Sequence, residues 1–281
     1  MSLKDLPPIR EALEEYGLLA KKSFGQHFLL DLNITRKIAR LAEVVEGQTV
    51  IEVGPGPGGL TRALLEAGAK VIAVEMDPRF FPLLNGLGDA APGQLHLVQN
   101  DALRVKEADL IAEHAPDTQA SVVANLPYNV GTALLLKWLT GPWQPRSMTL
   151  MFQKEVADRI TAQVGDDAYG RLAVVVQATA KARTVMDLPA RAFTPPPKVT
   201  SAVVNLTPLT DRPDAAMLKA LERTTQAAFG QRRKMLRSSL KTLGGTELCL
   251  AAGIDPDARA ETVDADGFLA LAKIVLAQSA T

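Results

Sequence analysis

The first half of the chain alternates short apolar runs with segments in which apolar residues recur at helical spacing. Each run has five or six residues and leads through a turn or a polar residue into a helical pattern; the runs are 49–53, 70–75, 94–99, 121–125 and 147–152. This repetition of strand, turn and helix is typical of an α/β fold with a doubly wound parallel sheet. The runs therefore predict five buried strands.

Beyond residue 170 the alternation gives way to one helical and two extended segments. Residues 169–182 fit a helix better than a strand, whereas 182–190 and 199–209 have the composition of strands. A proline-rich stretch, FTPPPK, joins the two extended segments. We expect these two segments to be the closing strands of a seven-stranded, mostly parallel sheet.

The last part of the chain has helical patterns only. The polar, proline-containing segment 207–215 has the character of a linker, and helical patterns then cover 217–245, 247–254 and 264–278. We therefore predict two domains, a large α/β domain over 1–210 and a small all-α domain over 211–281.

The composition is that of an ordinary globular protein of 281 residues, 47% of them hydrophobic and 22% charged. The single cysteine, Cys249, excludes an intrachain disulfide and favours a reducing cytosol. No apolar run approaches the roughly 18 residues of a membrane span, and no cluster of Cys and His predicts a metal site. We expect a cytoplasmic protein with no membrane segment and no metal.

Charge is unevenly distributed although the formal net charge is zero. Residues 181–241 contain twelve Lys and Arg but four Asp and Glu, whereas 242–281 contain six acids and two bases. A basic block on a neutral protein predicts a face that meets a polyanion. A solvated helix surface is the alternative explanation.

A glycine-rich turn, EVGPGPGG (52–59), follows the first predicted strand and precedes a helix. Glycines let a ligand approach the backbone closely, and a helix N-terminus offers free N–H groups. The spacing of Gly54, Gly56 and Gly58 differs from the G-x-G-x-x-G fingerprint of dinucleotide sites. It is the spacing of enzymes that bind S-adenosylmethionine (AdoMet), so we predict AdoMet as the cofactor.

Acidic residues end the next two predicted strands. A carboxylate at Glu75 can accept hydrogen bonds from both ribose hydroxyls of a nucleoside, and Asp101 can accept from the adenine amino group. Helix capping is the alternative explanation for such residues, and Asp77, before a proline, fits it better than Glu75. For Asp101, a cap on the following helix remains open.

The fourth predicted strand ends in Asn125-Leu126-Pro127-Tyr128, the form of a signature found in methyltransferases that act on planar exocyclic amines. Such an amine is a poor nucleophile, and it needs acceptors that hold its hydrogens and aim its lone pair. The Asn125 side-chain oxygen and the Leu126 carbonyl can supply them, while Pro127 fixes that carbonyl. Tyr128 offers a face on which an extruded base can stack. A structural turn with a core tyrosine is the alternative.

These stretches, with others in the same order, resemble the ribosomal RNA adenine dimethyltransferase family over residues 20–270. The similarity extends to KKSFGQHFL, VIAVEMD, MFQKEVADRI, AFTPPPKVTSAVV and AFGQRRKMLRSSL. The resemblance implies the Rossmann-like fold of class I AdoMet methyltransferases with a C-terminal all-α domain. It also implies dimethylation of the 6-amino groups of two adjacent adenosines near the 3′ end of 16S rRNA, with the small ribosomal subunit as partner.

The resemblance assigns further residues to the site. Gly54, Glu75, Asp101 and Asn125 are expected to line the cofactor site, which the backbone of His27 and Leu29 closes; the family more often has Asn at 27. Walls for the cofactor adenine are expected at Met76, Ala102 and Leu103. Phe193 is expected to sandwich the target base against Tyr128, and core packing is its alternative.

Basic residues are expected to bind the rRNA backbone. In QRRKMLRSSL, a helix would place Arg233 and Arg237 on one face, flanked by Arg232 and Lys234. Further candidates are Lys21, Lys22, Arg171 and Lys198. We expect a monomer.

Three other functions remain open at this point. One is the resistance-type relative that methylates a large-subunit adenosine, which FTPPPKVTSAVV and FGQRRKMLRSSL disfavour. Another is an assembly checkpoint factor for the small subunit in which binding matters more than methylation. The third is a nucleotide-dependent oxidoreductase.

Overall fold

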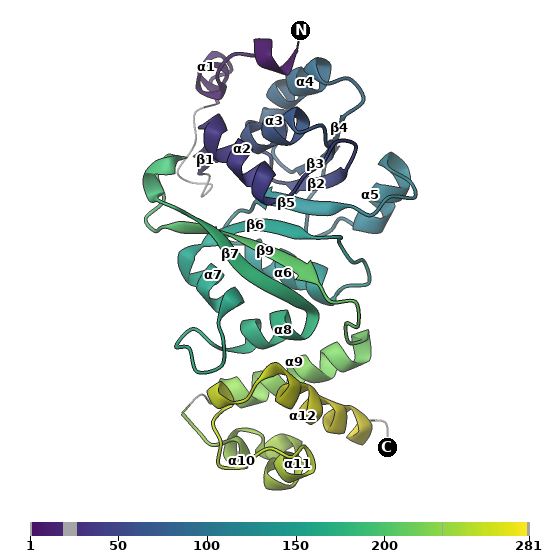
Figure 1. The fold of residues 1–281 in the computed structure, drawn as a ribbon, viewed down its shortest axis with the longest axis vertical. Coiled ribbons are helices and arrows are strands. Elements are labelled where there is room, and N and C mark those ends of the chain that lie inside the picture. The colour runs from purple at the N-terminus through teal and green to yellow at the C-terminus, as the bar shows by residue number, and fades with distance from the viewer. Residues whose placement is uncertain (1, 19–26, 232, 280–281) are drawn as a thin grey trace. The chain divides into compact units, whose positions relative to one another are not determined.

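A computed structural model describes residues 2–18, 27–231 and 233–279, and it contains a seven-stranded sheet (Figure 1). The strand order is β4-β3-β2-β5-β6-β9-β7. The strands are β2 (Thr49–Val53), β3 (Lys70–Glu75), β4 (Leu95–Gln99), β5 (Ser121–Asn125), β6 (Met148–Gln153), β7 (Ala180–Leu188) and β9 (Ser201–Pro208). The predicted seven strands are confirmed, and all of them overlap the runs identified in the sequence.

The five strands from β4 to β6 are parallel, and β9 runs antiparallel to β6. β2 is the central strand of the parallel part, since Val50 lies beside Val71 of β3 on one side and Ser121 of β5 on the other. The chain therefore builds the sheet outward from β2 in one direction and then in the other. In such sheets, ligands bind where the strand order reverses, at the carboxyl ends of the strands.

Helices precede, connect or follow the parallel strands. They are α2 (Leu32–Leu41), α3 (Gly59–Glu66), α4 (Phe81–Ala90), α5 (Glu107–His114), α6 (Gly131–Thr140) and α7 (Lys154–Thr161). Because crossovers between parallel strands are right-handed, the reversal of strand order places α3 and α4 on one face and α5 and α6 on the other. Both faces of the inner strands β2 and β5 are thereby covered, whereas the edge strand β4 stays partly exposed.

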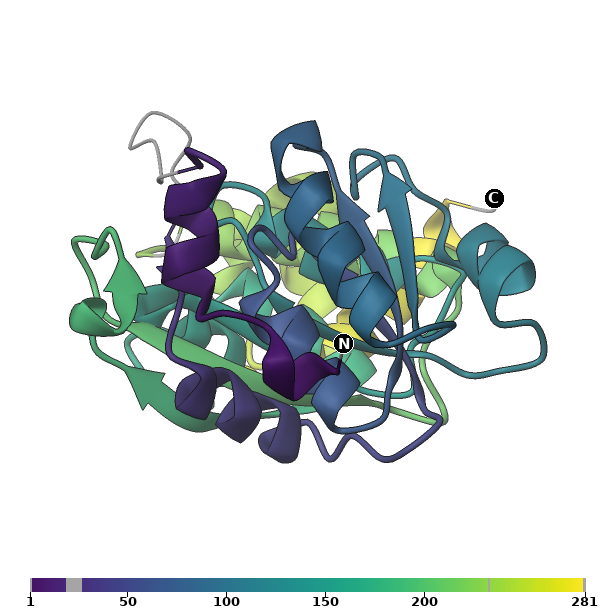
Figure 2. The ribbon, with the colours of Figure 1, turned by 90° about the horizontal axis from the view of Figure 1, so that it is seen from above.

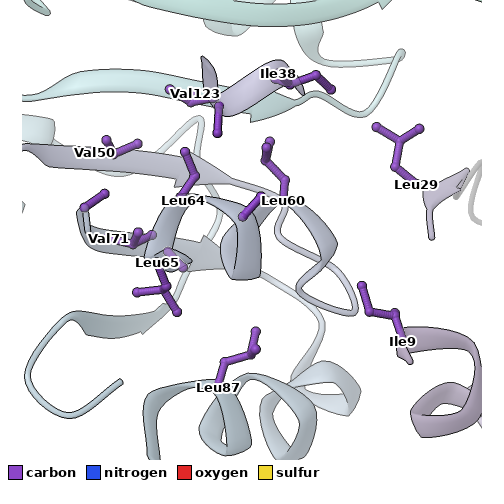
Figure 3. Close-up of a cluster of buried hydrophobic side chains, with 14 of the residues drawn as sticks. Ile9, Leu29, Ile38, Val50, Leu60, Leu64, Leu65, Val71, Leu87 and Val123 are labelled. Carbon is purple, nitrogen blue, oxygen red and sulfur yellow. The ribbon is translucent and has the colours of Figure 1, made fainter. Parts of the chain in front are cut away.

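The main apolar cluster lies between one face of the sheet and helices α2, α3 and α4. Figure 3 shows part of it; the labelled residues include Ile38, Leu60, Leu64, Leu65, Leu87, Val50, Val71 and Val123. Leu64, Val50 and Val71 are fully shielded from solvent. This packing fixes α3, whose first residue follows the glycine turn.

The N-terminal segment, purple in Figures 1 and 2, lies against α3. It contains the short helix α1 (Ile9–Glu15). Arg62 of α3 is almost fully buried and donates hydrogen bonds to the carbonyls of Pro7 (3.0 Å) and Leu6 (3.3 Å). Ile9 and Leu13 add apolar contacts to the main cluster.

Two short strands outside the main sheet connect distant parts of the sequence. β1 (Phe28–Leu29) pairs antiparallel with β8 (Phe193–Thr194), so that Phe28 faces Thr194 and Leu29 faces Phe193. Residues 28–29 and 193–194 are therefore neighbours in space, and the Thr194–Pro195 peptide bond is cis.

The chain folds into two compact units, each made of segments that are separate in the sequence. The first comprises residues 1–138, 143–157 and 184–206, and the second 139–142, 158–183 and 207–281. Besides α8 (Arg171–Thr179), the second unit contains α9 (Ala215–Gly230), α10 (Leu236–Ser239), α11 (Gly245–Ala251) and α12 (Ala265–Gln278). α8 belongs to this compact unit although it precedes residue 210 in the sequence. The predicted domain boundary at residue 210 stays a prediction.

The second unit has its own core, to which Tyr169, Leu236, Cys249 and Phe268 belong. Tyr169 donates a hydrogen bond to the carbonyl of Val263 at 2.9 Å, and burial raises its pKa to about 12. Cys249 is fully buried in this core. In the described ranges no helix has the length and apolar character needed to cross a membrane.

The predicted helix through QRRKMLRSSL is wrong. α9 ends at Gly230, and Gln231 (φ −129°, ψ 61°) and Met235 (φ −67°, ψ 152°) leave the helical region. Met235 forms an isolated bridge with Arg259, a contact across the fold that local periodicity does not reveal. Arg233 thus lies in a loop while Arg237 lies in α10, so the two do not share a helix face.

Candidate active site

A cavity of about 470 Å³ lies in the first unit at the carboxyl ends of the strands, where the strand order reverses. Most of the residues predicted to form the site line it. These are His27, Leu29, Gly54, Gly56, Glu75, Met76, Asp101, Ala102, Leu103, Asn125, Leu126, Pro127 and Tyr128. The ends of β2, β3, β4 and β5 thus contribute to one cavity, as the sequence predicted.

The glycine turn adopts a backbone that other residues rarely take. Gly54, Gly56 and Gly58 have φ of +68°, +53° and +86°, in the region that Gly enters without steric cost. A Cβ on Gly59 would lie 2.5 Å from the carbonyl oxygen of Leu29, so β1 runs directly against the turn. Among the predicted glycines, Gly58 does not line the cavity; it caps α3 and faces Leu87.

Glu75 ties the glycine turn to the end of β3. One carboxylate oxygen accepts from the N–H of Gly56 at 3.0 Å, and the other accepts from the N–H of Asp77 at 2.8 Å. Burial raises the pKa of Glu75, and the hydrogen bonds from those backbone donors reduce this increase. Asp77 itself caps the 3₁₀ turn at 78–80 by accepting from Arg79 N–H at 3.1 Å, as its position before a proline predicted. Glu75 is therefore not a helix cap.

Asp101 organises the loop after β4. Its side chain accepts from the N–H of Leu103 at 2.9 Å, and its carbonyl accepts from Arg104 N–H at 2.9 Å. The following helix begins at Glu107 with Lys106 as its N-cap residue, so Asp101 does not cap it. Its side chain is 39% exposed, and the carboxylate keeps acceptor capacity for a ligand in the cavity.

Asn125 stands at the end of β5 beside both the glycine turn and β1. Its amide nitrogen donates to the carbonyl of His27 at 3.3 Å, which leaves the amide oxygen as the acceptor end. A Cβ on Gly54 would lie 3.6 Å from Pro127 Cδ, so the turn and the Asn-Leu-Pro-Tyr motif are in contact range. Leu126 is 2% exposed and anchors the motif in the interior.

Tyr128 and His27 form one wall of the cavity. Their ring centroids are 5.7 Å apart with an interplanar angle of 29°. The Tyr128 hydroxyl hydrogen-bonds with Ser201 Oγ at 2.6 Å, and burial raises the tyrosine pKa. His27 Nδ1 lies 2.8 Å from the carbonyl of Pro195. Because a carbonyl only accepts, Nδ1 carries the proton in this contact.

Phe193 does not line the cavity. Its side chain is 3% exposed, lies beside Leu29 in the β1–β8 pair and belongs to the main apolar cluster. This is the core-packing position that was its alternative in the sequence. The predicted contact with a target base stays a prediction, and it requires Phe193 to leave that position.

The predicted RNA-binding residues are only partly described. Lys21, Lys22 and Arg232 lie outside the described residues. In the second unit, Arg233 and Lys234 are exposed, and Arg237 forms an ion pair with Asp257 at 2.7 Å. The guanidinium of Arg237 therefore already has a carboxylate partner within the protein.

Sequence reasoning missed Glu52, which lines the cavity from within β2. It is 1% exposed, and its Oε2 has no hydrogen-bond partner among the described residues. Burial, and then the nearby charge of Glu75, raise its pKa from 4.5 to about 8. The available signal was an acid inside an otherwise apolar strand, TVIEV. In the described parts of the chain, no group of three or more His, Cys, Asp or Glu could hold a metal ion.

Comparisons with known proteins find relatives that match nearly the whole chain. A family model described as "Ribosomal RNA adenine dimethylase" matches residues 17–276. "Ribosomal RNA small subunit methyltransferase A" of Phenylobacterium zucineum is 69% identical over 278 residues, which cover 99% of this chain and 96% of that protein. The protein of the same name from Caulobacter vibrioides is 67% identical over 258 residues, with 92% and 98% covered.

Two solved structures share the fold. A dimethyladenosine transferase from Plasmodium falciparum has a TM-score of 0.70 at 26% identity, with 87% of this chain and 96% of that chain covered. The 23S rRNA methyltransferase ErmE has a TM-score of 0.65 at 26% identity, with 88% and 98% covered. The predicted Rossmann-like methyltransferase fold is thereby confirmed.

Proposed function

The chain belongs to the ribosomal RNA adenine dimethylase family, and we propose that it uses AdoMet to dimethylate two adjacent adenosines near the 3′ end of 16S rRNA. The relatives named for the small subunit are 69% and 67% identical to it, whereas the 23S enzyme is 26% identical. The large-subunit reaction and nicotinamide redox chemistry are therefore not supported.

One observation carries this proposal: the Asn-Leu-Pro-Tyr motif and the glycine turn line the same cavity, with Pro127 and Gly54 in contact range. Transfer between a bound donor and an amine needs the two reacting atoms within about 3–3.5 Å and aligned. A motif that holds amines and a turn that admits a nucleoside cofactor must be neighbours for that geometry to exist. A binding module would have no need for the pairing.

The residues at the cofactor end of the cavity have the hydrogen-bonding groups that AdoMet needs. Gly54 and Gly56 line this end with bare backbone, and Glu75 and Asp101 provide carboxylate acceptors at adjacent strand ends. Bound AdoMet would supply an electrophilic methyl group on sulfur. The work of this chain is to orient it, with Glu75 accepting from ribose hydroxyls and Asp101 from the adenine amino group.

The amine end needs two acceptors and a stacking surface. The Asn125 oxygen and the Leu126 carbonyl would hold the two hydrogens of the target amine, so that its lone pair faces the methyl group. Tyr128 would stack against the extruded base, held in orientation by its 2.6 Å hydrogen bond with Ser201. No strong base is needed, because the nitrogen becomes acidic as it forms its new bond. His27, with its Nδ1 proton directed at Pro195, is not required to accept one.

The partner in this proposal is the small ribosomal subunit, bound by a monomer in the cytoplasm. The exposed Arg233 and Lys234 of the second unit would contact rRNA phosphates, with Lys21, Lys22 and Arg232 as further candidates. Such contacts give salt-dependent affinity and little sequence choice. Sequence choice would then come from the shape of the assembled subunit and from the fit of the flipped base.

The decisive experiment compares the wild type with Asn125→Ala in methyl transfer to small subunits from cells that lack the enzyme. We expect the rate constant to fall about 100-fold, because the amine loses one holder and its alignment, while AdoMet affinity changes far less. Asn85→Ala, which removes an exposed amide on α4, is the control and should keep the wild-type rate. An unchanged rate in Asn125→Ala would refute the role of the motif.

The same Asn125→Ala protein also separates catalysis from assembly. If it restores subunit assembly in cells without restoring dimethyladenosine, binding has a function of its own. If both are lost together while subunit binding persists, methylation is the main function.

A further inference from the structure

A polar cluster beneath the loop that carries Asp101 takes no part in the reaction proposed above. Lys137 of α6 directs its ammonium at the carbonyl of Ala102 (2.8 Å), the carbonyl of Val105 and the carboxylate of Glu107 (2.7 Å). Trp138 donates its indole N–H to the same Glu107 oxygen at 2.7 Å. All of these residues lie in the first unit.

The cluster is largely buried and its donors are fully used. Glu107 is 7% exposed and Trp138 1%. An ammonium has three N–H donors, and here each has an acceptor. Separating Lys137 from Glu107 would leave a largely buried charge without its partner, which is costly. The ion pair is therefore expected to keep the ammonium in place.

Two of the three acceptors are backbone carbonyls of the loop that forms the adenine side of the cavity. Ala102 directly follows Asp101, whose carboxylate accepts from Leu103 N–H at 2.9 Å and whose carbonyl accepts from Val105 N–H at 3.1 Å. The ammonium and Asp101 therefore both bind backbone groups of the same turn.

Besides these contacts, an exposed ion pair joins Arg104 to the Asp101 carboxylate at 3.7 Å. Leu103 is 41% exposed, the side chain of Arg104 is 84% exposed, and Val105 is the buried apolar residue of the segment. Segments with few buried apolar contacts open easily. A cation that binds the carbonyls of both Ala102 and Val105 would therefore restrict the orientation of the Asp101 carboxylate in the cavity.

We propose that Lys137, balanced by Glu107, is a positioning residue that fixes Asp101 for recognition of the adenine amino group of the cofactor. The inference rests on the proposed function, since it takes Asp101 as the acceptor from that amino group. Lys137 touches no ligand in this scheme. It acts through the carbonyls of Ala102 and Val105.

The test measures a preference between two ligands rather than an affinity alone. S-adenosylhomocysteine carries the amino group, whereas S-inosylhomocysteine carries a carbonyl oxygen in its place and a proton on N1. The part of their Kd ratio that Asp101→Ala removes reports the Asp101 contact. A hydrogen bond to a charged group corresponds to about 10- to 100-fold in affinity. We expect the wild type to show such a preference and Asp101→Ala to lose most of it.

The variant that tests Lys137 is the double substitution Lys137→Met/Glu107→Gln. It leaves no unpaired charge, and the glutamine oxygen can still accept from Trp138. We expect the preference to fall about tenfold, towards that of Asp101→Ala, with the far-UV circular dichroism of the wild type. A general loss of stability would weaken both ligands alike and leave their ratio unchanged.

Arg212→Met is the matched control. Arg212 also donates to two backbone carbonyls, those of Leu139 (2.9 Å) and Gly141 (2.8 Å), but these residues do not line the cavity. Its preference ratio should equal that of the wild type. Lys137→Arg provides a second measurement should the double variant not fold. A planar guanidinium cannot direct three N–H groups as an ammonium does, so we expect an intermediate ratio.

The outcomes separate the inference from the proposed function. A folded double variant, or Lys137→Arg, with the wild-type ratio would overturn the positioning role if Asp101→Ala has lost the preference. An Asp101→Ala protein that keeps the full preference would instead remove Asp101 from adenine recognition, and with it that part of the proposed function.

Discussion

Replacing Glu52 with Gln should stabilise the protein, and increasingly so as the pH rises. Burial raises the pKa of this carboxyl from 4.5 to about 8 in the folded state. Between these values the folded protein holds a proton that the unfolded chain has released. Stability therefore falls as pH rises through that window. Gln at this position does not titrate, so the variant lacks this dependence.

The magnitude follows from the two pKa values. Each pH unit between them changes the free energy of unfolding by about 1.4 kcal/mol. Across the window from 4.5 to about 8 the difference between Glu52→Gln and the wild type approaches roughly 5 kcal/mol. This is an upper limit, because a local opening that lets the ionised carboxylate reach water lowers the cost of its charge. Near pH 5 the two proteins should be close in stability.

Urea unfolding followed by tryptophan fluorescence measures this difference in the relevant part of the molecule. The chain has two tryptophans, and both Trp138 and Trp143 belong to the unit that contains Glu52. Free energies at pH 5, 6.5 and 8 would be obtained by linear extrapolation. All other titrating groups are common to both proteins and cancel in the difference.

Glu66→Gln is the control of opposite sign. A hydrogen bond from Arg36 at 2.6 Å lowers the pKa of Glu66, so this carboxylate is ionised in both states between pH 5 and 8. Its replacement should lower stability by a constant amount over that range. A constant difference for Glu52→Gln as well would show that Glu52 titrates normally, and the reasoning from its burial would fail.

Two further predictions concern the turn and the rRNA surface. Gly59→Ala would place a Cβ 2.5 Å from the Leu29 carbonyl. We expect a loss of about 1–3 kcal/mol in thermal unfolding and weaker AdoMet binding by calorimetry, whereas Gly86→Ala, with open space around it, should be neutral or stabilising. Arg233→Glu should weaken binding to small subunits at low salt and reduce the slope of log K against log salt by about one, without changing AdoMet affinity. Equal subunit affinity would exclude this residue from the interface.

The fold was predictable because its strands are short, apolar and separated by turns. Both faces of β2 and β3 are covered, so runs such as TVIEV and KVIAVE are apolar at most positions and stand out from the helices between them. The break after Gly230 was not predictable in this way. It depends on the bridge between Met235 and Arg259, two positions brought together by the folded second unit.

The site was predictable where it depends on strand ends and not where it depends on contacts across the fold. Glu75 and Asn125 end strands and Asp101 follows one, and parallel strands bring their carboxyl ends to one edge. The contact of Lys137 with the loop after Asp101 and the burial of Phe193 depend on how helices and β1 pack. Neither leaves a local pattern in the sequence.

Glu75 and Asn125 form hydrogen bonds with backbone groups of the surrounding site. Both oxygens of Glu75 accept from backbone N–H groups, and the Asn125 nitrogen donates to the His27 carbonyl. Carboxylate and amide oxygens accept more than one hydrogen bond, so ligand donors can be added while the backbone contacts remain. The walls then need not reorganise when a ligand enters, and binding free energy is not spent on forming the site. In the proposed reaction one amide would thus serve both parts of the cavity: the Asn125 nitrogen holds the His27 carbonyl just before β1, and the Asn125 oxygen is left to accept from the target amine.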